Sequence, residues 1–426
     1  MFKDNVFSAA DILLPAHTDM QKWSVVACDQ YTSQPEYWQQ LEKFVGDAPS
    51  TLRLTLPEIY LGTAQEARRG DAIASTCEEL LKGNFFHEYP GAYVYTLRQL
   101  RDGGIRKGLM GMVDLTQYDY ATGSVTPIRA TEATVLERIP PRMAIRRKVP
   151  VEFPHVMLLA DDPSDELFRW LDEKKGGYQK LYDFPLNMDS GHVIGFLVAK
   201  EDHPFIDTYF QSLAAPNSAE SRYGIDAPPL ALAVGDGNHS LATARAVFLE
   251  RTKDMTTEER LSDPSRYALC EVVNLHDDTL QFEAIHRVLF GVDEQHLLEA
   301  LQAAHRITEG ASPDAQVFTL VGSQGERTFS ILDPTHKLTV GTLQLFLDKF
   351  LKENGGQIDY IHGDDTVRSL AEKGGVGFLL AAMKKEELFP AVLQNGVLPR
   401  KTFSMGHAYD KRFYLEGRRI RREEQA

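Results

Sequence analysis

The stretch best suited to chemistry is a glycine-rich turn at residues 235–240, with the sequence Gly-Asp-Gly-Asn-His-Ser. An apolar run precedes the turn and apolar residues at helical spacing follow it, so we expect a strand, a tight turn and a helix. This arrangement collects backbone N–H groups at a helix N-terminus, where they can bind a phosphate. Gly235 and Gly237 permit positive φ and close approach of such a ligand. The alternative is an ordinary turn in which Asn238 or Ser240 caps the helix.

Three ionisable residues are candidates for proton transfer or phosphate contact. Asp29 follows a short β-prone run, where a carboxylate can deprotonate a small hydroxyl substrate, although a turn-forming aspartate fits equally well. Glu132 lies near Arg129 and Arg138, so it can accept a proton, pair with an arginine or cap the following helix. His239, at the expected helix N-terminus, can donate to a phosphate oxygen or be a satisfied buried turn histidine.

Common nucleotide and hydrolase motifs do not account for the turn. Its Gly-x-Gly-x-x-Ser pattern lacks the third glycine of the dinucleotide fingerprint, and no acidic residue stands at the end of a following strand about 20 residues further on. The sequence contains no Gly-Lys-Ser/Thr, Gly-x-Ser-x-Gly, Cys-x-x-Cys or His-Glu-x-x-His. These absences exclude a Walker A loop, a serine-hydrolase elbow, a zinc finger and a zincin site. A nicotinamide-dependent oxidoreductase built on the incomplete fingerprint stays open.

Five segments spread over the chain together resemble the domain of unknown function 1015 (DUF1015) family. The turn is similar to the family's Asp-Gly-His-His-Arg signature, with Asp236, Gly237, Asn238, His239 and Ser240 at the matching positions. Four further segments resemble its Pro-Tyr-Asp, Arg-x-His-Glu-x-Thr, post-signature strand and Gly-x-x-Pro-x-Lys-Ser/Thr motifs, and they lie at residues 25–31, 128–134, 282–289 and 396–403.

The resemblance implies a distant relation to the ParB and sulfiredoxin nucleotide-binding fold, with ADP or ATP as cofactor. Some relatives in that fold phosphorylate free serine, with an N-terminal carboxylate as base. The chain departs from the pattern at Asn238, where sulfiredoxins carry a catalytic cysteine, so sulfinic acid reduction is not expected. It departs again at Ser240, where the family carries an arginine that would hold phosphate. Arg245 is the candidate to replace that arginine. Arg129 and Lys401 are further candidates for binding the nucleotide, although an exposed structural lysine fits Lys401 equally well.

Thiol and metal chemistry have little support in the sequence. The three cysteines, at positions 28, 77 and 270, are expected to be buried and inert, and the neighbouring Asp29 would raise the pKa of Cys28. Three acidic pairs could hold Mg²⁺ beside a nucleotide but are more typical of strand-end turns, namely Asp161-Asp162, Asp277-Asp278 and Asp364-Asp365. Mg²⁺ is therefore implied by the resemblance, with its ligands unassigned.

The elements that must position these residues alternate between strands and helices. Capping and periodicity predict a helix that begins at Pro35, a helix that ends at Gly83 and a helix capped by Ser164. Ranges expected from pattern alone are a hairpin around 102–104, a strand at 155–160, a loop at 214–229, a helix at 294–305, a hairpin at 322–325 and a helix at 343–353. This alternation predicts an α/β protein with a mixed sheet. A provisional boundary near residue 290 divides a nucleotide-binding domain (1–290) from a smaller α/β domain (291–426).

The net charge and the hydropathy of the sequence limit the classes of binding partner that we expect. The net charge of −15 disfavours general nucleic-acid binding, because an acidic surface repels phosphate backbones. The basic stretch between Lys411 and Arg422 is interpreted as a solvated face. No apolar run approaches the ~20 residues of a membrane span, and the N-terminus lacks a signal-peptide pattern, so we expect a cytoplasmic protein.

The leading functional hypothesis is an ADP- or ATP-dependent phosphotransferase acting on a small hydroxylated metabolite such as free serine. A non-catalytic nucleotide sensor is the alternative from a different class, since loss of the arginine at position 240 would weaken catalysis before it abolishes binding. A homodimer stays open.

Overall fold

The computed structural model describes residues 5–422, which fall into two compact units. The larger unit contains the described residues up to Ala130, then Thr134–Leu280 and the chain from His407 onward. The smaller unit contains Thr131–Ala133 and Gln281–Gly406. The change of unit after Leu280 lies near the expected boundary at 290, but the chain beyond Gly406 returns to the larger unit.

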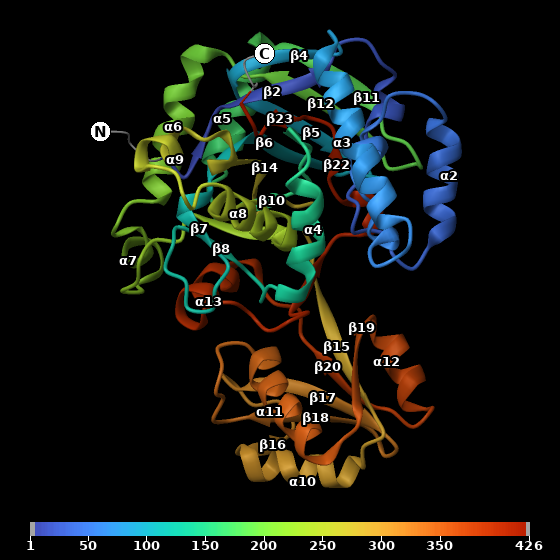
Figure 1. Ribbon diagram of the computed structural model, residues 1–426. Helices are drawn as coiled ribbons and strands as arrows, with labels where there is room; N and C mark the ends of the chain where they lie inside the picture. The colour runs from blue at the N-terminus through green and yellow to red at the C-terminus, as the bar shows by residue number, and fades with distance from the viewer. Residues whose placement is uncertain (1–4, 423–426) are drawn as a thin grey trace. The chain divides into compact units, whose positions relative to one another are not determined.

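The larger unit is built on a mixed sheet (Figure 1), which confirms the predicted fold class. Its strand order is β11-β12-β5-β6-β14-β10-β13-β8-β7, and β1 pairs with β6. Strand β10 runs parallel to β14 but antiparallel to β13, which in turn runs parallel to β8. The strands span β1 Phe7–Ser8, β5 Val94–Gln99, β6 Ile105–Asp114, β7 Tyr118–Asp119, β8 Ile128–Ala130, β10 Met157–Ala160, β11 Gln179–Pro185, β12 His192–Leu197, β13 Leu232–Asp236 and β14 Tyr267–Asn274.

Helices cover both faces of this sheet. Alternate residues of its strands point to opposite sides, so each face packs into a separate core. On one face, Leu109 and Cys270 pack with Phe168, Phe210 and Phe248 from three helices. On the other, Met110 and Leu269 belong to a core with Trp38 and Ile73 from two helices near the N-terminus. The helices of this unit span α1 Met20–Trp23, α2 Pro35–Val45, α3 Glu66–Lys82, α4 Ile139–Arg146, α5 Glu166–Lys174, α6 His203–Leu213, α7 Ser218–Tyr223, α8 Asn238–Arg251 and α9 Thr257–Ser262.

Short strands fasten the end of the described chain to the N-terminal half of the larger unit. Strand β22 (Phe413–Tyr414) pairs with β3 (Val25–Val26), and β23 (Arg418–Arg419) pairs with β9 (Val151–Glu152). The Trp23 indole N–H donates to the Leu415 carbonyl at 2.9 Å. A further pair joins β2 (Ala10–Pro15) to β4 (Phe86–Ala92). These pairings hold the segment at 407–416, which we call the return segment, against the sheet.

The smaller unit has an antiparallel sheet of its own, with the strand order β16-β18-β17-β20-β15-β19 and β21 paired to β15. Its elements span β15 Phe282–Phe290, α10 Glu294–Ala304, β16 Ile307–Glu309, β17 Gln316–Gly322, β18 Gly325–Ile331, α11 Thr339–Asn354, β19 Gln357–His362, α12 Asp364–Ala371, β20 Val376–Leu380, α13 Leu388–Asn395 and β21 Phe403–Met405.

Most local predictions are confirmed, and two are wrong. Helix α2 begins at Pro35, α3 is followed by Gly83, and the predicted hairpins are β5–β6 and β17–β18. However, Ser164 does not cap α5, because Asp165 holds that position in the left-handed region with φ 52°. The expected loop at 214–229 also contains α7, which polar residues form without a clear apolar stripe. Within residues 5–422, no helix is long and apolar enough to cross a membrane.

Candidate functional site

The glycine turn links β13 to α8, as predicted. Asp236 ends the strand, and Gly237 precedes the helix with φ 80°, a conformation that favours glycine. A Cβ on Gly237 would lie 3.0 Å from the Val156 Cα, so the turn packs closely on the chain beside β10. Gly235, in contrast, does not adopt the positive φ that a glycine permits.

The first turn of α8 keeps hydrogen-bonding capacity for a ligand. Gly237 is its N-cap, and no side chain caps the helix, so neither Asn238 nor Ser240 takes the capping role of the alternative interpretation. The buried Asn238 Oδ1 has no hydrogen-bond partner among the described residues. Uncapped N–H groups beside a residue without Cβ fit a phosphate group.

Asp236 is held ionised by a cation from the return segment. Its Oδ2 lies 3.2 Å from the Lys411 Nζ, and its Oδ1 accepts the Gly237 N–H at 2.9 Å. Burial alone would raise the pKa of Asp236, but Lys411, His155 and the Gly237 N–H outweigh it and hold that pKa below its ordinary value. Asp236 therefore orders the turn and fixes Lys411 beside it.

Asp29 lies in the same cluster, next to His155. The His155 Nε2 is 3.8 Å from the Asp29 Oδ2, and Gln30 donates to the Asp29 Oδ1 at 2.9 Å. The Tyr414 hydroxyl accepts the Cys28 N–H at 3.1 Å and lies 2.9 Å from the His155 Nδ1. Its proton is thus available to Nδ1, which leaves Nε2 to carry the ring proton toward Asp29. Asp29 and the turn residue Asp236 thus both lie near His155.

Three predicted binding residues form hydrogen bonds or an ion pair with other groups of the chain. The His239 Nε2 accepts the Val135 N–H at 3.2 Å, which leaves Nδ1 as the donor of a neutral ring. The buried Arg129 donates to the carbonyls of Thr126, Pro228 and Pro229. Arg245 lies 3.3 Å from the Asp119 carboxylate. Each of them ties segments around α8 together, and neither arginine takes the place of the family arginine at position 240.

Glu132 and Lys401 belong to the smaller unit. The Glu132 carboxylate accepts the backbone N–H groups of Lys401 and Thr402. Lys401 has φ 57° and an exposed side chain. Burial raises the pKa of Glu132 despite the opposing effect of Lys401. Glu132 thus anchors the backbone at residues 401–402, in a different unit from Asp29.

Cys77 and Cys270 are buried as expected, whereas Cys28 is partly exposed. Burial, with a further contribution from Asp29, raises the pKa of Cys28 to about 12, and burial raises that of Cys77 to about 12. Burial also raises the pKa of Cys270. Thiols in this state are poor nucleophiles at neutral pH.

Side chains that could hold a metal ion do not gather in the described part of the chain. Within residues 5–422, no group of three or more His, Cys, Asp or Glu side chains has a suitable arrangement. Of the acidic pairs, Asp161 instead contacts His276 at 2.5 Å and the Tyr223 hydroxyl at 2.5 Å. We therefore assign no ligand and no step to Mg²⁺.

Sequence reasoning missed His155, Lys411 and Tyr414. The solvated-face interpretation of the basic stretch is wrong, because Lys411 pairs with Asp236 and because Arg412 and Arg418 are buried, at 8% and 4% exposure. The available signal was the presence of several cations in a segment that also carries apolar residues at 413–415. Nothing local to it identifies carboxylates more than a hundred residues away.

Comparison with known proteins gives a family and weak structural likenesses. A family model described as "Protein of unknown function (DUF1015)" matches residues 11–350. A conserved hypothetical protein from Pyrococcus furiosus has 13% identity, a TM-score of 0.36, and coverage of 71% of this chain and 95% of its own. A free serine kinase variant in complex with ADP has 13% identity, a TM-score of 0.38, and coverage of 71% and 92%.

A third solved structure, SbnI with a C-terminal truncation from Staphylococcus aureus, has 10% identity, a TM-score of 0.36, and coverage of 73% and 87%. TM-scores this low carry no argument about this chain. No curated protein matches it.

Proposed function

The chain belongs to the DUF1015 family, and from that premise we propose that its larger unit is a phosphotransferase that uses ADP or ATP to phosphorylate a small hydroxylated metabolite, with free serine as the first candidate. The proposal extends to a cytoplasmic protein whose partners are a nucleotide and a small-molecule substrate. Its mechanism rests on the chain's own residues around the glycine turn.

The observation that carries the proposal is that Asp29 and the glycine turn share His155 as a neighbour. His155 lies 3.8 Å from Asp29 and also influences the charge of Asp236. A phosphate-sized ligand at the uncapped N-terminus of α8 would therefore have a carboxylate, an imidazole and the Lys411 ammonium nearby. Phosphoryl transfer needs this combination of positioning, electrostatic stabilisation and a proton acceptor.

In the proposed reaction, the acceptor hydroxyl oxygen bonds to the terminal phosphorus as the bond between that phosphorus and the bridging oxygen breaks. The Asp29 carboxylate takes the hydroxyl proton, and His155 orients that carboxylate through Nε2–H. The bound nucleotide supplies the phosphoryl group. The α8 N–H groups and Lys411 offset the negative charge that develops on the phosphate oxygens. Glu132, the other candidate base, has its carboxylate bound by two backbone N–H groups.

A non-catalytic nucleotide sensor is the second candidate function. It is favoured by the lack of a clamping arginine, because Arg129 and Arg245 are bonded elsewhere and position 240 is a serine. A site with backbone donors but no guanidinium clamp would bind phosphate with little stabilisation of the transition state.

The nicotinamide alternative has no support from the topology. A dinucleotide site needs two parallel, neighbouring strands joined by the helix. Strand β14 follows α8 in the chain but pairs with β10 and β6, and β13 is antiparallel to β10.

Calorimetric titration with adenosine, AMP, ADP and ATP, beside a ³¹P NMR assay for phosphorylation of free serine, tests the proposal. We expect ADP or ATP to bind much more tightly than adenosine, and phosphoserine to form. Nucleotide binding without transfer to any of a panel of hydroxylated amino acids and sugars would favour the sensor. Equal affinity for adenosine and the nucleotides would refute a phosphate site at the turn.

A further inference from the structure

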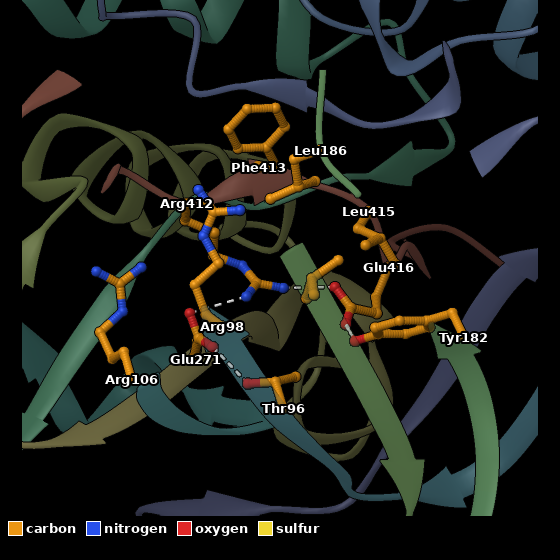
Figure 2. A pocket seen from close by; sticks show the side chains of 11 residues that line it. Thr96, Arg98, Arg106, Tyr182, Leu186, Glu271, Arg412, Phe413, Leu415 and Glu416 are labelled. Carbon is orange, nitrogen blue, oxygen red and sulfur yellow. Dashed lines mark hydrogen bonds and ion pairs between the residues drawn. The ribbon is translucent and has the colours of Figure 1, made fainter. Parts of the chain in front are cut away.

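A small cavity lies in the larger unit between the sheet and the return segment. It encloses about 20 Å³, which is room for a water molecule or an ion of similar size. Figure 2 shows three arginines, from β5, β6 and the return segment, gathered beside two glutamates. The polar side chains of the lining are Thr96, Arg98, Arg106, Tyr182, Glu271, Arg412 and Glu416.

One of the three arginines is already neutralised. The Arg412 Nη1 lies 2.8 Å from the Glu271 Oε2, and its other amino group pairs with Glu416. The remaining oxygens of these carboxylates are also occupied, since Thr96 donates to Glu271 at 2.7 Å and Tyr182 donates to Glu416. Glu271 acts on Arg98 and Arg106 only at longer range, since its direct contacts are with Arg412 and Thr96.

The other two arginines face each other, and neither makes an ion pair of its own within the described chain. Arg98 and Arg106 are direct partners in the antiparallel β5–β6 register, and each is only 5% exposed. Like charges in such a pair repel, and burial strengthens the repulsion. Burial and Arg106 lower the pKa of Arg98 to about 9, although Asp410 and Glu271 act in the opposite direction. Among residues 5–422, no carboxylate oxygen lies within ion-pair distance of either guanidinium.

Their hydrogen-bonding capacity is mostly unused. Arg98 donates one Nη2–H to the Tyr409 carbonyl at 3.0 Å, and Arg106 donates one to the Asp410 carbonyl at 2.9 Å. The Nε and Nη1 of Arg98 and the Nε of Arg106 have no partner within the described chain. The nearby Asp410 makes no ion pair with them, and its own Oδ1 is also without a described partner. A water molecule would satisfy the donors but would leave the repulsion.

We propose that this cavity is a binding site for a small monovalent anion, of the size of chloride or of a single carboxylate group, held between Arg98 and Arg106. The anion supplies an acceptor for the unpartnered donors and a negative charge in direct contact with both guanidinium groups. It also secures the return segment, since Arg98 and Arg106 bond to carbonyls at 409–410, directly before Lys411. The proposal is independent of the nucleotide function.

Thermal unfolding of the full chain tests it, with chloride, formate, acetate and phosphate added at constant ionic strength against gluconate, which is too large for the cavity. We expect saturable stabilisation by chloride and formate, weaker stabilisation by acetate and none specific to phosphate. Arg98→Met should weaken the apparent formate affinity by about 10- to 100-fold. Arg169→Met, which alters an exposed arginine on α5, should leave that affinity unchanged.

A crystal soaked in bromide gives a second readout that needs no variant. An anomalous peak within hydrogen-bonding distance of Arg98 and Arg106 would support the site. Water alone in the cavity, an unchanged formate response in Arg98→Met, or stabilisation by phosphate alone would each overturn the proposal.

Discussion

Lys411 sets the charge state of Asp236, although the two residues lie far apart in the sequence. Lys411→Met should cost on the order of 2 kcal/mol of unfolding free energy, because the partly buried carboxylate loses its cation. It should also raise the pKa of Asp236. Urea unfolding at pH 7 measures the loss. The double variant Asp236→Asn/Lys411→Met should recover part of it, since no charge is then left unpaired, and full stability in the single variant would refute the pairing.

Asp29 and Glu132 differ in the hydrogen bonds that their carboxylate oxygens already accept. Asp29→Asn keeps the shape of the side chain but removes the proton acceptor, so nucleotide affinity should persist while turnover falls by about 10²- to 10⁴-fold. Glu132→Gln keeps an acceptor for the N–H groups of Lys401 and Thr402, and turnover should stay within a few-fold of the unmodified protein. Calorimetry beside the product assay checks both variants. The reverse result would make Glu132 the base, and no loss in either would favour the sensor.

Residue types alone showed which side chains were candidates but not how each is used. Sequence spacing placed Asp29, Asp236 and His239 correctly after a strand or at a helix start, since these depend on local pattern. It could not show that Arg129 binds carbonyls at 228–229 or that Arg245 binds Asp119, because those partners follow from tertiary packing. Sequence analysis missed the role of His155 for the same reason, and it treated this residue only as part of a strand.

At the scale of elements, the β13–α8 turn depends on Gly237. Gly237→Ala places a Cβ at positive φ and 3.0 Å from the Val156 Cα, so either the turn or the neighbouring chain must shift. We expect a loss of about 1–3 kcal/mol in unfolding free energy and at least ~10-fold weaker nucleotide binding.

Gly224→Ala is the matched control for this turn. Gly224 also has a positive φ, at 66°, but a Cβ there would meet no atom within 4 Å. It should lose stability through backbone strain alone and keep its nucleotide affinity. Equal loss of affinity in both variants would show that strain, and not the shape of the turn, is responsible.

Elements with strong local signals were predictable. Proline at a helix start, glycine after a helix end and two-residue periodicity located α2, the end of α3 and the hairpins. Helix α7 and the Asp165 cap were missed because neither has an apolar pattern or the usual capping conformation. The pairing of β14 with β10, and not with β13, also lies beyond local pattern, since strand order is decided by how both sheet faces are covered.

At the scale of the whole molecule, buried carboxylates make the larger unit sensitive to acid. Burial alone would raise the pKa values of Glu152 and Glu271, but Arg418 and Arg146 for the first, and Arg412 and Arg106 for the second, hold them below the ordinary 4.5. A carboxyl whose pKa is lowered on folding contributes stability above its unfolded pKa and loses it as the pH falls through the folded value. Stability should therefore be constant down to about pH 5 and fall steadily below it.

Urea midpoints between pH 7 and pH 3 measure this loss. Glu152→Gln should start from a lower midpoint and show a shallower fall. Asp183→Asn should change the slope little, because Asp183 is exposed and its ion pairs are screened by water. A flat midpoint from pH 5.5 to pH 3 in the unmodified protein would contradict the assignment.

The whole-molecule arrangement was the least predictable from sequence. An α/β class with a mixed sheet follows from alternating periodicities, but the return of the chain at His407 does not. Arg412 and Arg418 look like solvent-exposed cations until Glu271 and Glu152 are placed beside them. The sequence shows which residues are charged, whereas their burial depends on segments that lie far apart in the chain.

Because the return segment is translated after residues 281–406, the larger unit can be completed only late in translation. Translation adds roughly 5–20 residues per second, so Asp236 emerges from the ribosome on the order of 10–40 seconds before Lys411. Throughout that interval β3 and β9 lack their partner strands, and Glu152 and Glu271 lack Arg418 and Arg412. The nascent larger unit therefore stays incomplete, with apolar surface exposed to chaperones, until residues 281–406 have been translated.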